Sequence, residues 1–372
     1  MRIAIITLPL HTNYGGLLQA YALQTVLERM GHQATVVDKK EFSLGLNIPL
    51  RRIVERLEKR LLRHDDCYVF YERKIKQWAP IIRQHTNRFI QSYIHTVKVR
   101  SLKNLKDGQF DAFVVGSDQI WRPVFTPQID LAYLSFTKGW DVLRLSYAAS
   151  FGVDTIEYTP SQIRKCKEAI AHFRAVSVRE SSGVDLCRQL FGVEAEWMID
   201  PTLLLSKNDY VALVEKAGIS QSAGSLFCYV LDKSAEIQKV IDTIGSQRQL
   251  TPFFLNAFSE NKKVEIEKRV QPPVEAWLRA FMDAEFVVTD SFHACVFSIL
   301  FHKPFVVCAN HGRGVSRLQS LLGAFGLADR FIFDAELPSA IFSPIDWEDV
   351  DRRLDGYRLN SQAFLSKYLG KN

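Results

Sequence analysis

The sequence places a histidine, His293, just after a short apolar run that is typical of a buried strand. That run, residues 286–289, is followed by Asp290 and Ser291, whose side chains can accept hydrogen bonds from the first amides of a helix. The next segment has the length of a short buried helix, and residues 305–308 form a second apolar strand. His293 is therefore predicted in the first turn of a helix at the carboxyl edge of a parallel sheet, where α/β folds bind ligands and helix amides attract anions. The alternative is a partly buried histidine with a structural role.

Other candidate site residues also follow predicted strands. Residues 111–116 end in a polar loop that contains Asp118, and residues 175–178 are followed directly by Arg179. The loop after the first strand carries an Asn-Tyr-Gly-Gly sequence, which lacks the GxGxxG spacing of a dinucleotide site. The candidates from these loops are Asn13, Gly15, Asp118, Gln119, Trp121 and Arg179. Asp118 has the alternative role of capping the turn that follows it, and Asp200, which precedes a proline, is expected to be structural.

Alternating strand and helix patterns along the chain predict an α/β fold with two domains. A chain of 372 residues is too long for one ordinary core, and the pattern restarts after residue 205. We expect an N-terminal α/β domain over residues 1–205 and a C-terminal α/β domain over residues 206–345, with the site in the cleft between them. Residues 346–372 predict a terminal helix that packs back on the N-terminal domain.

Basic residues are concentrated in one segment. The formal net charge is +6, yet residues 39–106 hold 17 Lys or Arg against 6 Asp or Glu, a net charge of +11. Helical spacing predicts that this segment is a helical insertion in the first domain, at about residues 39–106. It is either a solvated helical pair or a face for an anionic membrane lipid or an anionic substrate. Nucleic acid is a less favoured partner because no nucleic-acid motif accompanies the charge.

Composition argues against several other classes of protein. The apolar fraction of 47% and the charged fraction of 24% are typical of a soluble globular protein. No segment has the roughly 18 uncharged apolar residues that a membrane span needs. The six cysteines are scattered without a CxxC pair, so we expect reduced core cysteines in a cytoplasmic protein and no disulfide framework. No cluster has metal-ligand spacing, so we expect no metal site.

Six motifs, in this order, resemble those of the polysaccharide pyruvyl transferase family. They are NYGGLLQAYAL, VVGSDQIW, SYAASFG, SVRESSG, DPTLLL and TDSFHACVFSILFHKPFVV. The resemblance implies two Rossmann-like domains facing a cleft, similar to the GT-B architecture of sugar-nucleotide glycosyltransferases. It also implies transfer of a pyruvyl group from phosphoenolpyruvate to a sugar of a bacterial capsule, exopolysaccharide or cell-wall glycan, or of its lipid-linked precursor, as a ketal.

The resemblance extends to individual positions. The family's histidine motif matches residues 291–294, which makes His293 the implied catalytic histidine, and its strand-end arginine matches Arg179. Many members carry an arginine two positions before the histidine and a glycine after it, where this chain has Ser291 and Ala294. That arginine is implied to bind the anionic groups of the donor, so Ser291 puts donor specificity in question.

The chemistry of ketal formation assigns roles on the donor side. Phosphoenolpyruvate carries a carboxylate and a phosphate, which Arg179 and the amides around Ser291 are expected to bind. Asn13 and Gly15 could supply further amide donors. The reaction begins with protonation of the methylene carbon, which requires an acid that titrates near neutral pH, and His293 suits that step.

On the acceptor side, Asp118 is the candidate base for the sugar hydroxyl, and the neighbouring Gln119 and Trp121 are expected to contact the acceptor. The expected partners are phosphoenolpyruvate, as donor substrate with no cofactor, and a glycan or lipid-linked oligosaccharide. Weak contact with the anionic inner face of the membrane through residues 39–106 is a further expectation. Two other functions remain open: a sugar-nucleotide-dependent glycosyltransferase of the same fold, and a non-catalytic glycan-binding protein.

Overall fold

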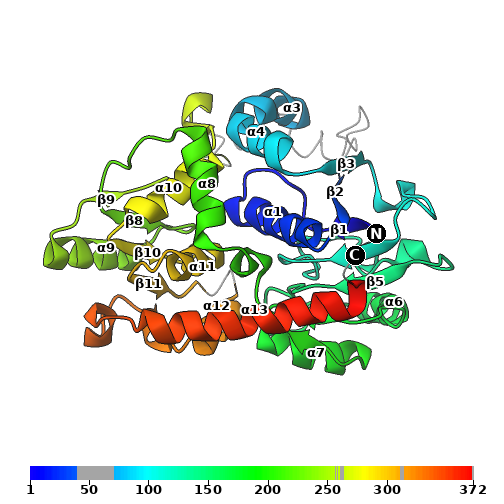
Figure 1. Cartoon of the computed structure of the whole chain (residues 1–372). Helices are drawn as coiled ribbons and strands as arrows, with labels where there is room; N and C mark the ends of the chain where they lie inside the picture. Colours follow the sequence, from blue (N-terminus) through cyan, green and yellow to red (C-terminus); the bar gives the residue numbers. More distant parts are fainter. Residues whose placement is uncertain (40–70, 256, 258, 260–263, 311–313, 371–372) are drawn as a thin grey trace, which may run out of the picture.

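The computed structural model describes residues 1–39, 71–255, 257, 259, 264–310 and 314–370, which form two α/β halves (Figure 1). Each half contains a parallel sheet with helices packed around it. The prediction of two Rossmann-like domains is therefore confirmed.

The sheet of the N-terminal half is built from short apolar runs. Its strands are β1 (Arg2–Ile6), β2 (Gln33–Lys39), β3 (Thr96–Val99), β4 (Ala112–Val115), β5 (Leu143–Ser146), β6 (Ser177–Val178) and β7 (Glu196–Trp197). The first five lie in the parallel order β3-β2-β1-β4-β5, and isolated bridges from Leu145 to Ala175 and from Ala149 to Val178 join the β6-β7 pair to them. Alternate residues of β1 belong to different apolar clusters, so both faces of the sheet are covered.

Helices of the N-terminal half begin and end at residues suited to those positions. They are α1 (Tyr14–Arg29), α3 (Tyr71–Ile82), α4 (Gln84–Tyr93), α5 (Ile129–Ala132), α6 (Pro160–Ile170) and α7 (Ser181–Phe191). The Asn13 side chain caps α1 by accepting a hydrogen bond from the Gly16 amide at 3.2 Å. A capping box at Thr159 starts α6, and Gly192, with φ of 71°, ends α7.

The C-terminal half has a second parallel sheet in the order β12-β11-β10-β8-β9. Its strands are β8 (Leu226–Tyr229), β9 (Pro252–Phe253), β10 (Phe286–Thr289), β11 (Phe305–Cys308) and β12 (Phe331–Ile332). Its helices are α8 (Lys207–Ala217), α9 (Ala235–Arg248), α10 (Val274–Asp283), α11 (Phe292–Leu300) and α12 (Val315–Ala324). The predicted strand–helix–strand unit around His293 is therefore β10-α11-β11.

One apolar core continues from the first half into the second. Tyr14 of α1 stacks on Trp277 of α10, with ring centroids 5.5 Å apart, and its hydroxyl donates to the Pro272 carbonyl. Phe297 of α11 and Tyr210 of α8 belong to the same buried cluster. The first turn of α1 is thus held against the C-terminal half, which matters for the site described below.

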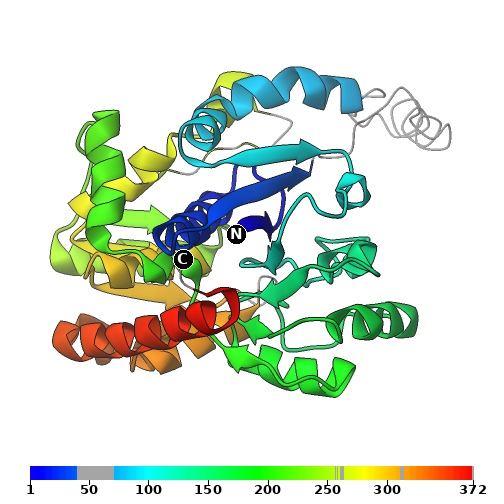
Figure 2. The same cartoon turned by 45° about the vertical axis from the view of Figure 1, so that its right-hand side comes forward.

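The last helix, α13 (Trp347–Leu369), crosses from the C-terminal half to the N-terminal half. Near its start Trp347 stacks on His302, and further along Arg358 donates to the Leu203 carbonyl at 2.7 Å. Figures 1 and 2 show the helix running beneath both halves and ending near the N-terminus. It therefore ties the two halves together.

The predicted helical insertion at about residues 39–106 lies partly outside the described residues, because residues 40–70 are not described. Helices α3 and α4 occupy part of the rest. Residues 96–99 lie within the predicted insertion but form the edge strand β3 and pair with β2. Their Thr-Val-Lys-Val sequence has the β-branched residues and the single lysine that suit an exposed edge.

Within the described ranges, no helix combines the length and the apolar character needed to cross a membrane. The cysteines there, Cys166, Cys187, Cys228, Cys295 and Cys308, are buried with free thiols. Cys67 lies outside the described residues.

Candidate functional site

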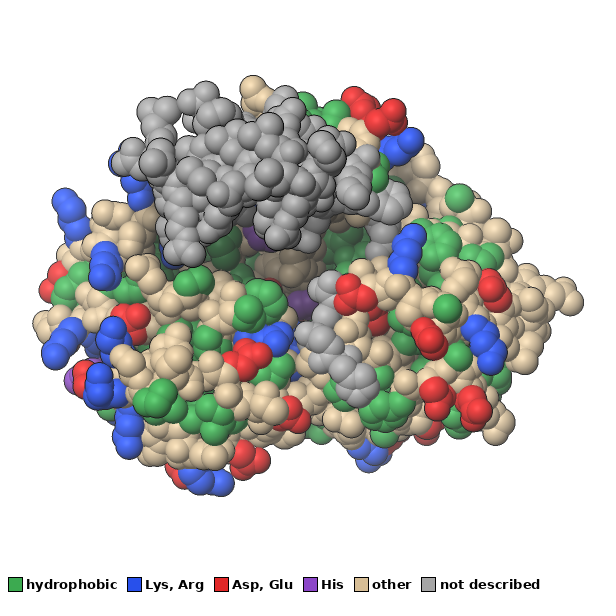
Figure 3. Space-filling model, turned by 180° about the vertical axis from the view of Figure 1, so that it is seen from behind, with side chains coloured by type: hydrophobic (Ala, Val, Ile, Leu, Met, Phe, Trp, Pro, Cys, Tyr) green, Lys and Arg blue, Asp and Glu red, His purple; other side chains and the backbone are tan. Residues whose placement is uncertain are grey.

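The carboxyl ends of four strands meet around one hollow between the halves. They are β1 and β4, neighbours in the first sheet, and β8 and β10, neighbours in the second. The strand order changes direction between the members of each pair, which is where open α/β sheets bind ligands. Loops that follow these four strands line the hollow, and Figure 3 shows histidine side chains inside it.

The hollow contains two adjoining cavities. The larger has a volume of about 570 Å³ and the smaller about 290 Å³. Residues that line both are Asn13, Asp118, Gln119, Phe125, Leu231, Ser291 and His293. The larger cavity also includes Thr12, Gly15, Tyr229, Gln271 and Trp277, and the smaller also includes Arg122, Asp290 and Arg317. The predicted residues Asn13, Gly15, Asp118, Gln119, Ser291 and His293 are thus brought together.

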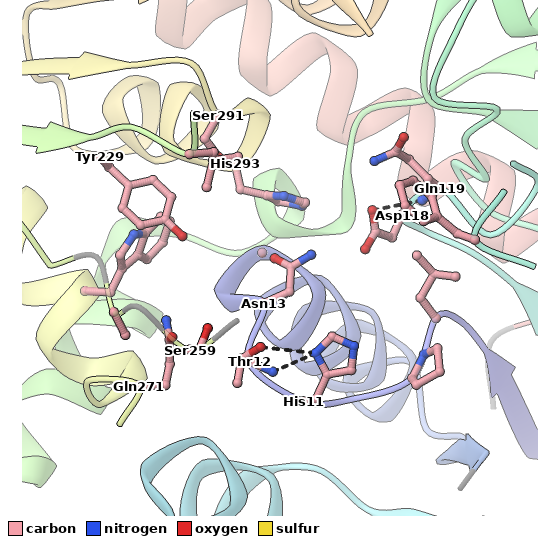
Figure 4. Close-up of a pocket in the computed structure, with 17 residues that line it drawn as sticks. His11, Thr12, Asn13, Asp118, Gln119, Tyr229, Ser259, Gln271, Ser291 and His293 are labelled. Carbon is pink, nitrogen blue, oxygen red and sulfur yellow. Dashed lines mark hydrogen bonds between the residues drawn. The ribbon is translucent and has the colours of Figure 1, made fainter. Parts of the chain in front are cut away.

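His293 reaches the cavities from the first turn of α11. Ser291 caps this helix by accepting a hydrogen bond from the Ala294 amide. The imidazole packs directly on the first turn of α1: a Cβ atom added at Gly15 would lie 2.0 Å from Nδ1 of His293. Any other residue at Gly15 would therefore displace the ring. In Figure 4 the ring extends from α11 above Asn13, toward the side of the cavity that carries Asp118.

Asp200 lies behind His293 and is fully buried. Its Oδ2 is 3.6 Å from Nε2 of His293 and 2.7 Å from a guanidinium nitrogen of Arg179. Ser117 donates to the same oxygen at 3.1 Å, and Thr202 donates to Oδ1 through its amide and its hydroxyl. Burial alone would raise the pKa of Asp200, but His293 and Arg179 outweigh it and lower that pKa. Asp200 therefore remains ionised against the imidazole.

Arg179 sits beneath the cavities rather than in their walls. Its side chain is 1% exposed, its guanidinium bonds to Asp200 and lies 3.7 Å from Asp118, and it stacks 4.3 Å from the centre of the Phe292 ring. Burial opposes its charge, but the two carboxylates outweigh this and raise the pKa of Arg179. The direct donor contact predicted for Arg179 does not fit this position, because it is not among the described residues that line the cavities.

Asp118 is held at the end of β4 with its side chain toward both cavities. Its Oδ1 accepts from the Gln119 amide at 2.8 Å, the cap-like contact considered above as its alternative role. Its backbone has a φ of 50°, a conformation that aspartate tolerates better than most residues. Gln19 of α1 accepts from the Ser117 amide and so supports the loop. Asp118 can therefore serve the cavity as well as the turn.

The acceptor contact predicted for Trp121 is wrong. Trp121 is fully buried, its indole donates to the Ala132 carbonyl, and its ring stacks on Tyr133 at 4.7 Å between centroids. The polar loop turns back into the domain after Gln119, so the bulky apolar side chain fills the core. Gln119 itself lines both cavities.

Two site residues were missed from the sequence. Asp200 was assigned a structural role because it precedes a proline, and it does cap the turn that follows. Its second role depends on His293 coming from the other half, which no local pattern reveals. Arg317, in the first turn of α12, lines the smaller cavity. In the sequence, Arg317 is marked only as an arginine at a position that helical spacing places on the buried side of the helix.

Replacing Arg179 by methionine is expected to lower the free energy of unfolding by about 3–5 kcal/mol, because Asp200 would remain as a buried carboxylate without its partner. Urea unfolding measures the change. Arg188→Met is the control: this exposed arginine on α7 pairs with Glu194 at the surface, where solvent screening leaves such pairs little effect on stability. An Arg179→Met protein as stable as the control would contradict the buried ion pair.

Within the described residues, no group of three His, Cys, Asp or Glu side chains is arranged to hold a metal ion.

Comparison with solved structures finds similar folds at low sequence identity. UDP-GlcNAc 2-epimerase from Neisseria meningitidis, bound to UDP-GlcNAc, aligns with a TM-score of 0.49 and 9% identity over 100% of both chains. Sucrose-phosphate synthase from Thermosynechococcus elongatus aligns with a TM-score of 0.46 and 11% identity, over 98% of this chain and 94% of that one. None of the curated proteins matches this chain.

The sequence gives a more specific match. The model of the family described as polysaccharide pyruvyl transferase matches residues 13–312, and this range includes Asp118, Arg179, Asp200 and His293. This range covers most of the 372 residues. The chain therefore belongs to the polysaccharide pyruvyl transferase family.

Proposed function

We propose that this protein transfers a pyruvyl group from phosphoenolpyruvate to two hydroxyls of a sugar in a bacterial surface polysaccharide or its lipid-linked precursor. The observation that carries the proposal is the placement of His293. Its imidazole is backed by the ionised Asp200 and faces two adjoining cavities at the strand ends of both halves. A reaction between two substrates with a proton transfer to one of them needs this arrangement.

The proposed reaction balances as follows. A proton is added to the methylene carbon of phosphoenolpyruvate, which leaves a positive, oxocarbenium-like carbon next to the carboxylate. The first sugar hydroxyl forms a bond to that carbon and loses its proton. The bond from the carbon to the phosphate oxygen then breaks, inorganic phosphate leaves, and the second hydroxyl closes the ring. The two sugar hydroxyls lose two protons in total. One replaces the proton that was added to the methylene carbon, and the other leaves with inorganic phosphate.

His293 is the proposed general acid in this reaction. Its Nε2 is buried and faces Asp200, while Nδ1 lies against Gly15, a residue that lines the larger cavity. Because Nε2 faces Asp200, Nδ1 is the nitrogen left for the proposed proton delivery. Asp200 acts as a positioning residue that fixes the orientation of the ring.

Asp118 is the proposed base for the acceptor hydroxyl. It lines both cavities and comes from the N-terminal half, whereas His293 comes from the C-terminal half. With both substrates bound between these residues, the acceptor hydroxyl would face Asp118 and the methylene carbon of the donor would face His293. Arg179 lies 3.7 Å from Asp118 and places a positive charge beside it.

Titration calorimetry distinguishes this function from sugar-nucleotide glycosyl transfer. The protein is expected to bind phosphoenolpyruvate and to bind UDP-glucose at least about tenfold more weakly, because a site for a small trianion and a sugar offers no nucleotide subsite. The converse order of affinities would favour a glycosyltransferase. Binding of glycans without either donor would favour a non-catalytic glycan-binding protein.

Weak association with anionic membranes is a further expectation, based on the net charge of +11 in residues 39–106. Each Lys or Arg near such a surface contributes about 1 kcal/mol. Co-sedimentation with phosphatidylserine vesicles should rise with anionic lipid and fall with salt. Changing Arg52, Arg56, Lys59 and Arg63 together to Gln should weaken it. Equal sedimentation of wild type and variant at low salt would contradict membrane binding through these residues.

A further inference from the structure

Two large apolar side chains are exposed in the walls of the cavities. They are Phe125, from the loop after β4, and Leu231, from the loop after β8, and each lines both the larger and the smaller cavity. Phe125 is the more exposed of the two, at 49%. An exposed phenyl ring is stabilised when a ligand removes it from water, so Phe125 bears on what the site binds.

The loop fixes Phe125 in this exposed position. Ile120 and Trp121, just before it in the chain, are buried in the core. The amides of Phe125 and Thr126 both donate to the Arg122 carbonyl at 3.1 Å, and the Thr126 hydroxyl donates to the Ile120 carbonyl at 3.0 Å. The exposure of the ring is therefore set by a hydrogen-bonded turn that is anchored in the core.

Arg122 holds the ring itself. Its guanidinium carbon lies 5.4 Å from the centre of the Phe125 ring, and its Nε and Nη2 donate to the two carboxylate oxygens of Glu157 at 3.0 and 2.9 Å. Because the guanidinium lies over one face of the ring, the opposite face is left for a ligand. The charge of Arg122 is paired with Glu157, so its role at this place is to position the ring.

Polar groups border the ring. Arg122 also donates from Nη1 to Oε1 of Gln119 at 3.4 Å, so the NH₂ group of Gln119 is the end that can donate to a ligand. Asp118, the proposed base, precedes Gln119, and Figure 4 shows the two side chains on the same side of the cavity. An apolar face beside an amide donor and a carboxylate suits a pyranose, which has C–H groups on its faces and hydroxyls at its edge. A lipid chain would leave the amide and the carboxylate without partners.

We propose that Phe125 stacks on the C–H face of the acceptor pyranose, and that Arg122 is the positioning residue that holds the phenyl ring for this contact. The assignment rests on the proposed function and adds an acceptor subsite to it. The aromatic acceptor contact expected from this loop thus moves from the buried Trp121 to Phe125, four residues further along. The hydroxyls at the edge of the stacked sugar face Gln119 and Asp118, as the proposed base requires.

The test compares Phe125→Ala with wild type. Saturation-transfer NMR with a panel of methyl hexosides measures acceptor binding without chemistry. The hexoside that binds wild type most tightly should bind the variant about tenfold more weakly, because the stacking surface is lost. Its kcat/KM in phosphate release should fall by a similar factor. The donor Kd, from calorimetric titration with phosphoenolpyruvate, should stay within about twofold.

Two further variants make the test specific. Phe125→Tyr keeps the ring and should bind the same hexoside within about threefold of wild type. Phe254→Ala is the matched control, because Phe254 is 46% exposed with Lys233 5.8 Å from its ring centre, yet it is not among the described residues that line either cavity. It should leave hexoside binding unchanged. Equal losses in Phe125→Ala and Phe254→Ala would contradict the assignment.

Comparison of aglycones shows whether the ring contacts the sugar. Phe125→Ala should weaken methyl and p-nitrophenyl hexosides alike, because the pyranose is common to both. If it weakens the p-nitrophenyl hexosides and leaves the methyl hexosides unchanged, Phe125 contacts the aglycone and the assignment to the sugar is overturned.

Failure of this inference and failure of the proposed function give different results. If wild type binds and consumes phosphoenolpyruvate but Phe125→Ala binds methyl hexosides as wild type does, the inference is overturned and the function stands. If wild type does not bind phosphoenolpyruvate but binds methyl hexosides in a way that depends on Phe125, the function is overturned and the sugar contact stands. If no methyl hexoside of the panel binds wild type, with or without phosphoenolpyruvate, the inference is overturned.

Discussion

Replacing His293 by alanine is expected to lower kcat by about 10²-fold or more, since the methylene carbon would lose its proton donor. The donor Kd should change little, because the proposed role of the imidazole is to protonate the methylene carbon and not to bind the anionic groups. Steady-state phosphate release measures kcat, and circular dichroism checks that the fold is intact. A variant within about threefold of wild type in kcat would remove His293 from the mechanism.

His95→Ala is the matched control for this change. His95 also pairs with a carboxylate, since its Nδ1 lies 2.8 Å from Glu28, but it is exposed on the N-terminal half at the end of α4. Its loss should leave kcat unchanged. An equal loss of activity in both variants would show that the effect of His293→Ala is not specific to the cavities.

Gly15→Ala is expected to cost about 10²-fold in kcat without removing any polar group. The added methyl carbon would lie 2.0 Å from Nδ1 and 2.2 Å from Cγ of His293, so the ring must move. A displacement of about 1 Å at a reacting group is enough for a loss of this size. The donor Kd should again change little, which separates misplacement of the acid from loss of donor binding.

Gly16→Ala provides the comparison at the neighbouring position. Both glycines lie in the first turn of α1, so alanine raises helix propensity at each by a similar amount. A Cβ at Gly16 would meet its nearest neighbour, Oδ2 of Asp118, at 3.4 Å, an ordinary contact distance. Gly16→Ala should therefore keep most activity. Equal kcat values for Gly15→Ala and wild type would mean that the ring position seen here is not the active one.

The fold could be predicted where the pattern is local. Residues 286–308 show a strand, a short apolar helix and a strand in sequence, and the structure has β10, α11 and β11 there. Helix α13 was predicted over residues 346–372, and it spans Trp347–Leu369 in the structure. Strand β3 was missed because four residues after two basic helices carry too little periodicity to separate them from the insertion.

Site residues could be predicted where a reactive side chain comes shortly after the end of a strand. His293 and Asp118 were found in this way, and both line the cavities. Trp121 was misassigned because a loop residue two positions beyond Gln119 can turn either way, and burial of an indole decides the direction. Asp200 and Arg179 pair across the N-terminal half, so their roles depend on contacts between residues distant in sequence.

The tight fit of His293 against Gly15 makes the position of the proposed acid depend on how the two halves pack. Gly15 belongs to α1 in the first half and His293 to α11 in the second, while Tyr14 fixes the same turn of α1 to Trp277. Asp200 completes the contact from the first half. The surroundings of the proposed acid are thus complete only when both halves are packed as described, which explains why no single stretch of sequence specifies them.

Turnover in D₂O tests the proposed pyruvyl transfer most directly. Wild type is incubated with phosphoenolpyruvate and a panel of p-nitrophenyl hexosides, and the products are followed by phosphorus and proton NMR. We predict phosphate and pyruvate ketal in equal amounts, with one deuterium in each ketal methyl group, and formation of both products about 10²-fold or more slower with His293→Ala. Consumption of UDP-sugars by the same preparation, with phosphoenolpyruvate left intact across the panel, would contradict it.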